Sequence, residues 1–221
     1  MKTIKAELII FDLDGTLIDS SSDIAYAANR TLERMGYVKF DIEHIKENIG
    51  WGVKVLLERL MPQEPPERIL EARRSFLEFY GSHLVVDTYL YSGVAETITR
   101  FAELGKKMAI VTNKPEGLTL RLLDEMKIGG ASMRRYFPVV VGGDTLVVRK
   151  PSPEPIQAAI KAAGGAQGSS VMVGDSPIDA EAGHAAGIFT IGVTYGFRGQ
   201  DELTGFDILL DRFSGLKDVI E

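Results

Sequence analysis

Residues 8–16 read LIIFDLDGT, four apolar residues followed by two aspartates that flank a leucine, then glycine and threonine. An apolar run without polar alternation is typical of a strand buried on both faces, as in a parallel sheet covered by helices. Asp12 and Asp14 come directly after this run. Two carboxylates at the end of a buried strand cost free energy unless a cation or hydrogen-bond donors accompany them. The stretch therefore predicts a parallel sheet with an anionic site at the end of its first strand.

Further apolar runs indicate more strands of the same sheet. They lie at residues 108–111, 139–141, 171–173 and 190–193, with a weaker one at 207–210. Segments with helical periodicity lie between them, at residues 94–104, 117–126, 154–163 and 178–186. Strands that alternate with helices predict a doubly wound, Rossmann-like α/β core with a mainly parallel sheet.

The stretch from about residue 20 to residue 80 interrupts this alternation. It has helical periodicity almost throughout and is punctuated by Pro62, Pro65 and Pro66. We therefore predict an all-helical domain inserted after the first strand, with connectors near residues 17–20 and 88–93. The predicted division is an α/β core domain of residues 1–18 and 90–221 and a helical inserted domain of residues 19–89.

Composition excludes several classes of protein. The chain of 221 residues has 25 Lys and Arg against 31 Asp and Glu, a formal net charge of −6, and no cysteine. Without a basic run there is no reason to expect a nucleic-acid partner, and without cysteine there are no disulfides, zinc–thiolate sites or thiol nucleophiles. The first apolar run is too short for a signal peptide or a membrane span. We expect a cytoplasmic monomer or homodimer that does not bind membranes.

Two polar motifs follow later predicted strands. Thr112, with Asn113 beside it, can offer a hydroxyl and a backbone N–H to a phosphate oxygen, although taken alone the pair fits a helix cap or turn better. Arg149 and Lys150 precede Pro151, and a lysine there supplies a compact positive charge for a phosphate. The spacing does not choose between these two cations.

A second pair of carboxylates follows the strand at 171–173. Asp175 comes just after this strand and Asp179 lies one helical turn later, and carboxylates are the hard oxygen ligands that Mg²⁺ prefers. Taken alone, Asp175 fits the N-cap of the following helix about as well. Because an aspartate can attack phosphorus, the motifs together supply a nucleophile, a phosphate cradle and a metal site at one edge of the sheet.

In this order the motifs resemble those of the haloacid dehalogenase superfamily. The matching residues are Asp12 with Asp14, Thr112, Lys150, and Asp175 with Asp179. The helical insert after the first motif is similar to that superfamily's cap. Within the superfamily, the chain most resembles the phosphoglycolate phosphatase branch. The similar segments are 111–116, 141–145, 150–155, 171–176, 192–196 and, in the cap, 49–52.

The resemblance implies a Mg²⁺-dependent phosphatase that hydrolyses a small phosphorylated metabolite through an aspartyl phosphate, with 2-phosphoglycolate as the expected substrate. Alternatives on the same scaffold are a β-phosphoglucomutase-like phosphomutase, a pyrophosphatase or another small-metabolite phosphatase. A non-enzymatic alternative is a phosphoaspartate binding or signalling module.

The resemblance also implies a role for each motif residue. Asp12 is the implied nucleophile and a Mg²⁺ ligand, and Asp14 is the general acid and base, whose backbone carbonyl also binds the metal. The implied phosphate-binding residues are Thr112, Asn113 and Lys150. Asp175 completes the metal ligands, and Asp179 orients Lys150 or a metal-bound water.

The sequence also suggests positions for several other polar and aromatic residues. The candidate substrate-specificity loop of the cap consists of Gly50, Trp51 and Gly52. The alternative is that Trp51 is a core residue. Arg198 is expected to be exposed, with a position at the rim of the site as the alternative. We assign His44, His83 and His184 to surface or helix packing because they lack metal-ligand spacing.

Overall fold

Six parallel strands form the central sheet of the computed structural model, which describes residues 3–221. Their order across the sheet is β10 (Ile208–Leu210), β9 (Phe189–Val193), β8 (Ser170–Gly174), β1 (Leu8–Phe11), β4 (Lys107–Val111) and β7 (Val139–Val141). Every predicted strand is present. The winding direction reverses beside β1, which is the arrangement of a doubly wound sheet. The predicted α/β fold class is confirmed.

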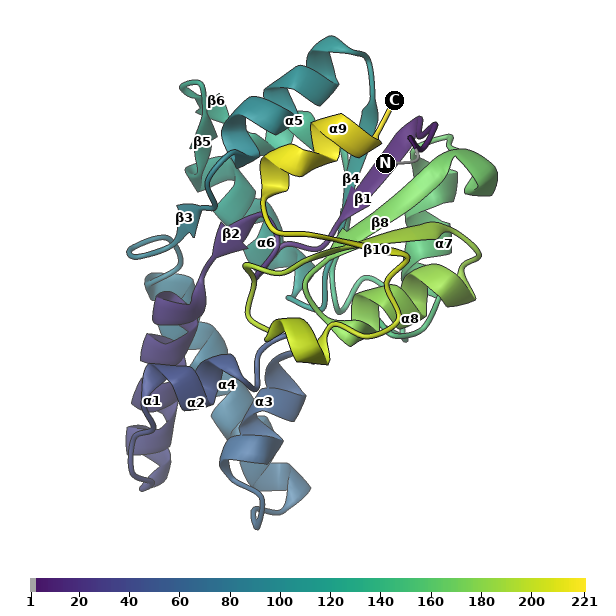
Figure 1. Cartoon of the computed structure of the whole chain (residues 1–221). Coiled ribbons are helices and arrows are strands. Elements are labelled where there is room, and N and C mark those ends of the chain that lie inside the picture. The colour runs from purple at the N-terminus through teal and green to yellow at the C-terminus, as the bar shows by residue number, and fades with distance from the viewer. Residues whose placement is uncertain (1–2) are drawn as a thin grey trace.

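Helices cover both faces of this sheet (Figure 1). They are α5 (Val94–Glu103), α6 (Glu116–Glu125), α7 (Glu154–Ala162), α8 (Pro177–Ala185) and α9 (Leu216–Val219). The alternating residues of β1 belong to two separate apolar cores, with Leu8 and Ile10 in one and Ile9 and Phe11 in the other. This two-sided burial explains why the sequence of the strand lacks polar alternation.

The four cap helices occupy the long segment between β1 and α5. They are α1 (Ser21–Met35), α2 (Ile42–Lys46), α3 (Val53–Leu60) and α4 (Pro66–Ser82). Helices α1 and α4 pack against each other through buried apolar residues such as Leu32 and Phe76. Figure 1 shows the cap beyond the end of the sheet toward which β1 runs. The helical content predicted for this segment is thus present, while the exact domain limits stay a prediction.

The two connectors between core and cap pair with each other. Strand β2 (Ile18–Asp19) runs antiparallel to β3 (Tyr89–Leu90), with Ile18 opposite Leu90. Beside this pair, the buried carboxylate of Asp23 in α1 accepts hydrogen bonds from the backbone N–H groups of residues 86–88 and from the Thr88 hydroxyl, at 2.6 to 3.2 Å. A single side chain therefore fixes the chain where it leaves the cap.

Some elements were not predicted. Residues 127–136 form a hairpin of β5 (Lys127–Ile128) and β6 (Ala131–Ser132), followed by the 3₁₀ turn η1 (Met133–Tyr136). Gly129 and Gly130, both at positive φ, make its two-residue turn. Helix α9 and three short 3₁₀ turns, η2 (Gln167–Ser169), η3 (Gln200–Glu202) and η4 (Phe213–Gly215), were also missed. Within residues 3–221, no helix combines the length and apolar character needed to cross a bilayer.

Asp23→Ala tests the anchoring of the connector. The change leaves several partly buried donors without an acceptor, so we expect the free energy of unfolding, measured by urea denaturation, to fall by about 3 kcal/mol. Asp41→Ala is the control, since it removes only the exposed N-cap of α2 and should cost about 1 kcal/mol. Equal small losses for the two variants would contradict the anchoring role.

Candidate active site

The predicted motifs meet at the carboxyl edge of the sheet. Phe11 lies opposite Ile110 of β4 and Val173 of β8, so the residues that follow these three strands lie at nearly one level. The side chains brought together there are those of Asp12, Asp14, Thr112, Asn113, Lys150, Asp175 and Asp179, all of them buried. The convergence expected from strand ends is therefore present in the structure.

Lys150 links two of the predicted carboxylates. Its Nζ lies 2.9 Å from Asp12 Oδ1 and 2.7 Å from Asp179 Oδ1, and the residue is 2% exposed. Burial lowers the pKa of Lys150, but the carboxylates of Asp12 and Asp179 outweigh it and the net pKa is raised. Of the two neighbouring cations it is Lys150 that contacts Asp12, whereas Arg149 is half-buried and lies beside Gly52 of the cap.

Three buried carboxylates lie close together here, and Lys150 contacts two of them. Oxygens of Asp12, Asp175 and Asp179 lie within 4.8 Å of one another. Burial, reinforced by the other two carboxylates, raises the pKa of Asp175 to about 8. Burial also raises the pKa of Asp179, against the opposing effect of Lys150. One positive charge does not balance this acidic group, and its hard oxygen donors fit a divalent cation such as Mg²⁺.

Two glycines allow the loops around Asp175 to close. The Asp175 carboxylate accepts hydrogen bonds from the Phe197 N–H at 2.8 Å and from the Thr16 hydroxyl at 3.3 Å. Gly15 has a φ of +87°, and a Cβ there would lie 2.1 Å from Asp175 Oδ2. A Cβ at Gly196 would lie 2.3 Å from the Cβ of Asp175. Both positions require glycine because the loops after β1 and β9 approach this carboxylate directly.

Asp14 has a partner that the sequence analysis did not single out. Lys114 Nζ lies 2.6 and 2.8 Å from its two carboxylate oxygens, and the Ser20 hydroxyl donates to Oδ1 at 2.5 Å. Burial lowers the pKa of Lys114, but Asp14 outweighs it and the net pKa is raised. The available signal was the position of this lysine two residues after Thr112, at the end of a buried strand.

Asn113 joins the core to the cap. Its side-chain Nδ2 donates to the carbonyl of Gly50 in the cap at 2.9 Å and to the carbonyl of Lys150 at 3.0 Å. Its Oδ1 is buried and has no hydrogen-bond partner among the residues that the structure describes. The phosphate-binding role of Asn113 stays a prediction, and the structure adds a contact with the cap.

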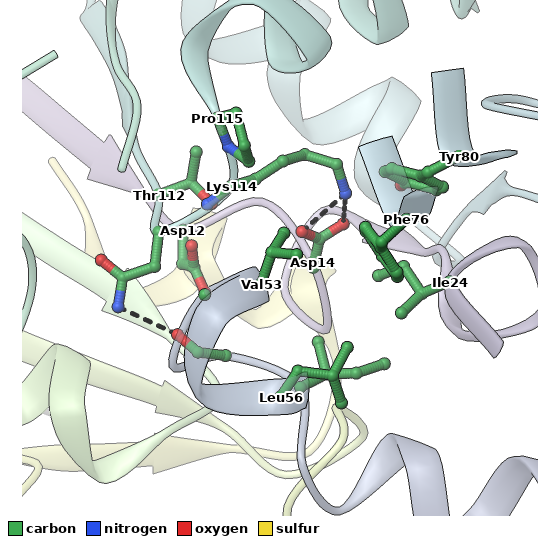
Figure 2. Close-up of a pocket in the computed structure, with 14 residues that line it drawn as sticks. Asp12, Asp14, Ile24, Val53, Leu56, Phe76, Tyr80, Thr112, Lys114 and Pro115 are labelled. Carbon is green, nitrogen blue, oxygen red and sulfur yellow. Dashed lines mark hydrogen bonds and ion pairs between the residues drawn. The ribbon is translucent and has the colours of Figure 1, made fainter. Parts of the chain in front are cut away.

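Only part of the cap segment predicted to face the substrate lines a pocket, and its role in specificity stays a prediction. Gly50 and Gly52 line the pocket between cap and core, together with Asp12, Asp14, Ile24, Ile49, Val53, Leu56, Phe76, Tyr80, Thr112, Asn113, Lys114 and Pro115. Figure 2 shows side chains from both domains around this space. Trp51 is not among the lining residues; it is half-buried, with the Arg59 guanidinium 5.3 Å from its ring centroid.

The expected exposure of Arg198 is wrong. The residue is 8% exposed, and its guanidinium donates to the backbone carbonyls of Lys46, at 3.3 Å, and Ile49 in the cap. These carbonyls lie at and just beyond the C-terminal end of α2, where helical carbonyls lack internal partners and attract a cation. The loop after β9 thereby contacts the cap.

The described residues contain a second acidic group, whose role differs. Ligand atoms of Asp23, His83 and Asp87 lie within 4.8 Å of one another. Both oxygens of Asp23 already accept hydrogen bonds from the returning connector, and His83 stacks on Tyr26 at 3.9 Å between ring centroids. This group therefore holds the connector that leaves the cap. The stacking of His83 agrees with the packing role expected for it.

Comparison with known proteins assigns the family. The haloacid dehalogenase-like hydrolase family matches residues 9–193, and the chain belongs to this family. A phosphoglycolate phosphatase of Colwellia psychrerythraea is 37% identical over 209 residues, which cover 91% of this chain and 90% of the relative. One from Photobacterium profundum is 36% identical over 224 residues, covering 97% of this chain and 96% of that protein.

A solved structure agrees with these relatives. The crystal structure of a predicted phosphoglycolate phosphatase from Haemophilus somnus aligns with a TM-score of 0.84 at 28% identity, over 96% of this chain and 97% of that chain. The chain is a phosphatase of the haloacid dehalogenase-like family, and the expected enzyme class, a phosphoric monoester hydrolase, is confirmed. The resemblance to the phosphoglycolate phosphatase branch is confirmed as well.

Gly15→Ala should disable the site. The added methyl group would collide with the Asp175 carboxylate in addition to straining a positive φ. We expect phosphatase activity to fall by about 100-fold or more because the displaced carboxylate misplaces the reacting groups. Gly36→Ala is a matched control, since Gly36 has a φ of +85° but open space around it. The control should cost only about 1 kcal/mol of stability and keep full activity. Equal activities of the two variants would refute the close-approach argument.

Magnesium should stabilise the folded chain through Asp175. At a Mg²⁺ concentration of about 100 times Kd, binding adds about 2.7 kcal/mol, which raises Tm by about 5 °C or more. We expect Asp175→Asn to abolish this shift in differential scanning fluorimetry, whereas Asp211→Asn, at an exposed position, should retain it. A full Mg²⁺ shift in the Asp175 variant would exclude this residue as a ligand.

Proposed function

We propose that this phosphatase is Mg²⁺-dependent and hydrolyses 2-phosphoglycolate to glycolate and phosphate through a phosphoaspartate on Asp12. The observation that supports the mechanism is the buried contact of Lys150 with Asp12 and Asp179, next to Thr112 at the carboxyl edge of the sheet. The contact supports a mechanism in which Asp12 is the nucleophile and Lys150 binds the phosphate next to it. The names of the relatives in Colwellia and Photobacterium support the substrate.

The residues present fit the proposed metal. Asp12, Asp175 and the backbone carbonyl of Asp14 would hold Mg²⁺, and the excess of buried carboxylates over lysines at this point is the observation that favours it. Mg²⁺ bound there would neutralise negative charge on the transferring phosphoryl group.

The side chains of the site divide the reaction into two displacements. In the first, a carboxylate oxygen of Asp12 forms a bond to phosphorus, the ester P–O bond breaks, and Asp14 gives a proton to the leaving oxygen. In the second, water attacks the phosphorus, Asp14 takes a proton from it, and the bond to Asp12 breaks. Lys150 and Thr112 bind the phosphoryl oxygens in both steps, and Asp179 orients Lys150.

The cap gives this chemistry a closed chamber. We propose a core domain of residues 1–18 and 90–221 and a cap domain of residues 19–89, joined by the β2–β3 pair. The contacts of Asn113 and Arg198 with cap carbonyls hold the two parts together over the pocket. A closed cap excludes bulk water from the nucleophile and adds contacts to the substrate. A cytoplasmic location and Mg²⁺ as the physiological metal belong to the same proposal.

Asp12→Asn tests the nucleophile. An amide cannot form the phosphoaspartate, so we expect kcat for 2-phosphoglycolate with Mg²⁺ to fall by at least about 1,000-fold, measured by phosphate release. Asp211→Asn, at an exposed position, should keep wild-type kcat. Substantial turnover by the Asp12 variant would refute its role.

The substrate is tested with the wild-type enzyme. We expect kcat/KM for 2-phosphoglycolate to exceed the values for glucose 1-phosphate and pyrophosphate, and EDTA to abolish activity until Mg²⁺ is restored. A higher value for pyrophosphate, or conversion of glucose 1-phosphate to glucose 6-phosphate, would replace the proposed substrate with one of the alternatives.

A further inference from the structure

Lys114 is the only cation among the described residues that line the pocket between cap and core. It follows β4 and is 6% exposed. In Figure 2 its ammonium group lies beside Asp14 and near Phe76 and Tyr80, whereas Asp12 lies near Thr112 on the other side of the pocket. The pocket therefore extends past the nucleophile to a second charged position.

The donors at this second position are not all used. An ammonium group has three N–H donors, and Lys114 directs two of them at the oxygens of Asp14. The nitrogen lies 4.8 Å from the centroid of the Tyr80 ring. The Tyr80 hydroxyl is buried and makes no hydrogen bond of ordinary geometry within residues 3–221. Since buried polar groups normally have partners, the Tyr80 hydroxyl beside the Lys114 ammonium group indicates a polar group on a ligand.

The surroundings restrict what this group is. Ile24, Leu56 and Phe76 from three different cap helices form apolar walls of the pocket. A sugar would leave several hydroxyls unpaired against such walls, and a second phosphate would need more donors than one N–H and one O–H. A carboxylate has two oxygens and one charge, which matches this pair of donors.

The charges around the pocket also favour a carboxylate on the substrate. A substrate anion at this end of the pocket would be repelled by the carboxylate of Asp12 and by the substrate's own phosphate. Lys114 is the pocket-lining cation placed to offset that repulsion, because Lys150 is engaged with Asp12 and Asp179. Without Lys114, an ester bearing a second negative charge would be disfavoured relative to a neutral ester.

We propose that Lys114, together with Tyr80, binds the carboxylate of the substrate and so selects phosphate monoesters of short hydroxy acids over neutral phosphate esters. This inference deepens the proposed function and depends on it for the location of the reacting phosphate beside Asp12. It assigns specificity to a residue of the core domain whose side chain reaches under the cap.

The test compares 2-phosphoglycolate with 2-hydroxyethyl phosphate, in which a hydroxymethyl group replaces the carboxylate. We expect wild-type kcat/KM to favour phosphoglycolate. Lys114→Met should lower kcat/KM for phosphoglycolate about 10- to 100-fold more than for the neutral ester, as expected for loss of a charge-assisted hydrogen bond. Tyr80→Phe should lower this preference about 5-fold. Lys54→Met is the control, since Lys54 is on cap helix α3 with an exposed side chain, and its preference should equal that of the wild type.

Parallel losses on both esters in the Lys114 variant would overturn the inference, because they would mean that Lys114 acts only through Asp14. A wild-type enzyme without preference for the carboxylate would overturn it too. If Lys114→Met does not fold, Tyr80→Phe decides, and an unchanged preference there counts against the proposal.

The substrate proposal and this inference fail in different ways. Suppose that the wild-type enzyme hydrolyses 2-phosphoglycolate and that Lys114→Met lowers kcat/KM equally for 2-phosphoglycolate and 2-hydroxyethyl phosphate. This result would refute only the role of Lys114. A wild-type enzyme that is inactive on 2-phosphoglycolate but prefers O-phospholactate to its neutral alcohol analogue would refute only the named substrate. Loss of that preference in Lys114→Met would then still support the role of Lys114.

Discussion

The buried contact of Lys150 with Asp12 and Asp179 is the interaction on which the rest of the site depends. The lysine follows β7, one aspartate follows β1 and the other lies in α8, so the contact joins three separate parts of the core. Removal of one partner from a buried ion pair costs about 3 to 5 kcal/mol because it leaves an uncompensated charge. The groups that carry out the chemistry are therefore also groups that hold the strand ends in register.

Features that depend on the local chain could be predicted from the sequence. The strands were found because burial on both faces removes polar residues from them, and the four core helices between them were placed to within one residue at each end. Asp12 and Asp175 were found because carboxylates after buried strands need a reason to be there. The spacing alone left the choice between Lys150 and Arg149 open, and only the family resemblance named Lys150, since the choice depends on which side chain reaches Asp12 and Asp179.

The predictions failed where the direction of a side chain depends on the other domain. Lys114 received no expectation and Arg198 was expected to be exposed, yet Lys114 lies against Tyr80 of the cap and Arg198 binds cap carbonyls. Asn113 likewise has a cap carbonyl as a partner. Most of these contacts join a core side chain to a cap backbone carbonyl, which water can replace at a modest net cost. Such an interface suits a cap that closes and opens in each turnover.

The pairing of the two connectors has a consequence for how the enzyme could diversify. Ile18 lies opposite Leu90, so the chain leaves and re-enters the core at neighbouring points of one ladder. A segment whose two ends lie together can be exchanged or lengthened without moving the structure that carries it, as in domain insertion. Replacement of the cap by another segment would thus leave the nucleophile in place and change the residues that line the pocket around it.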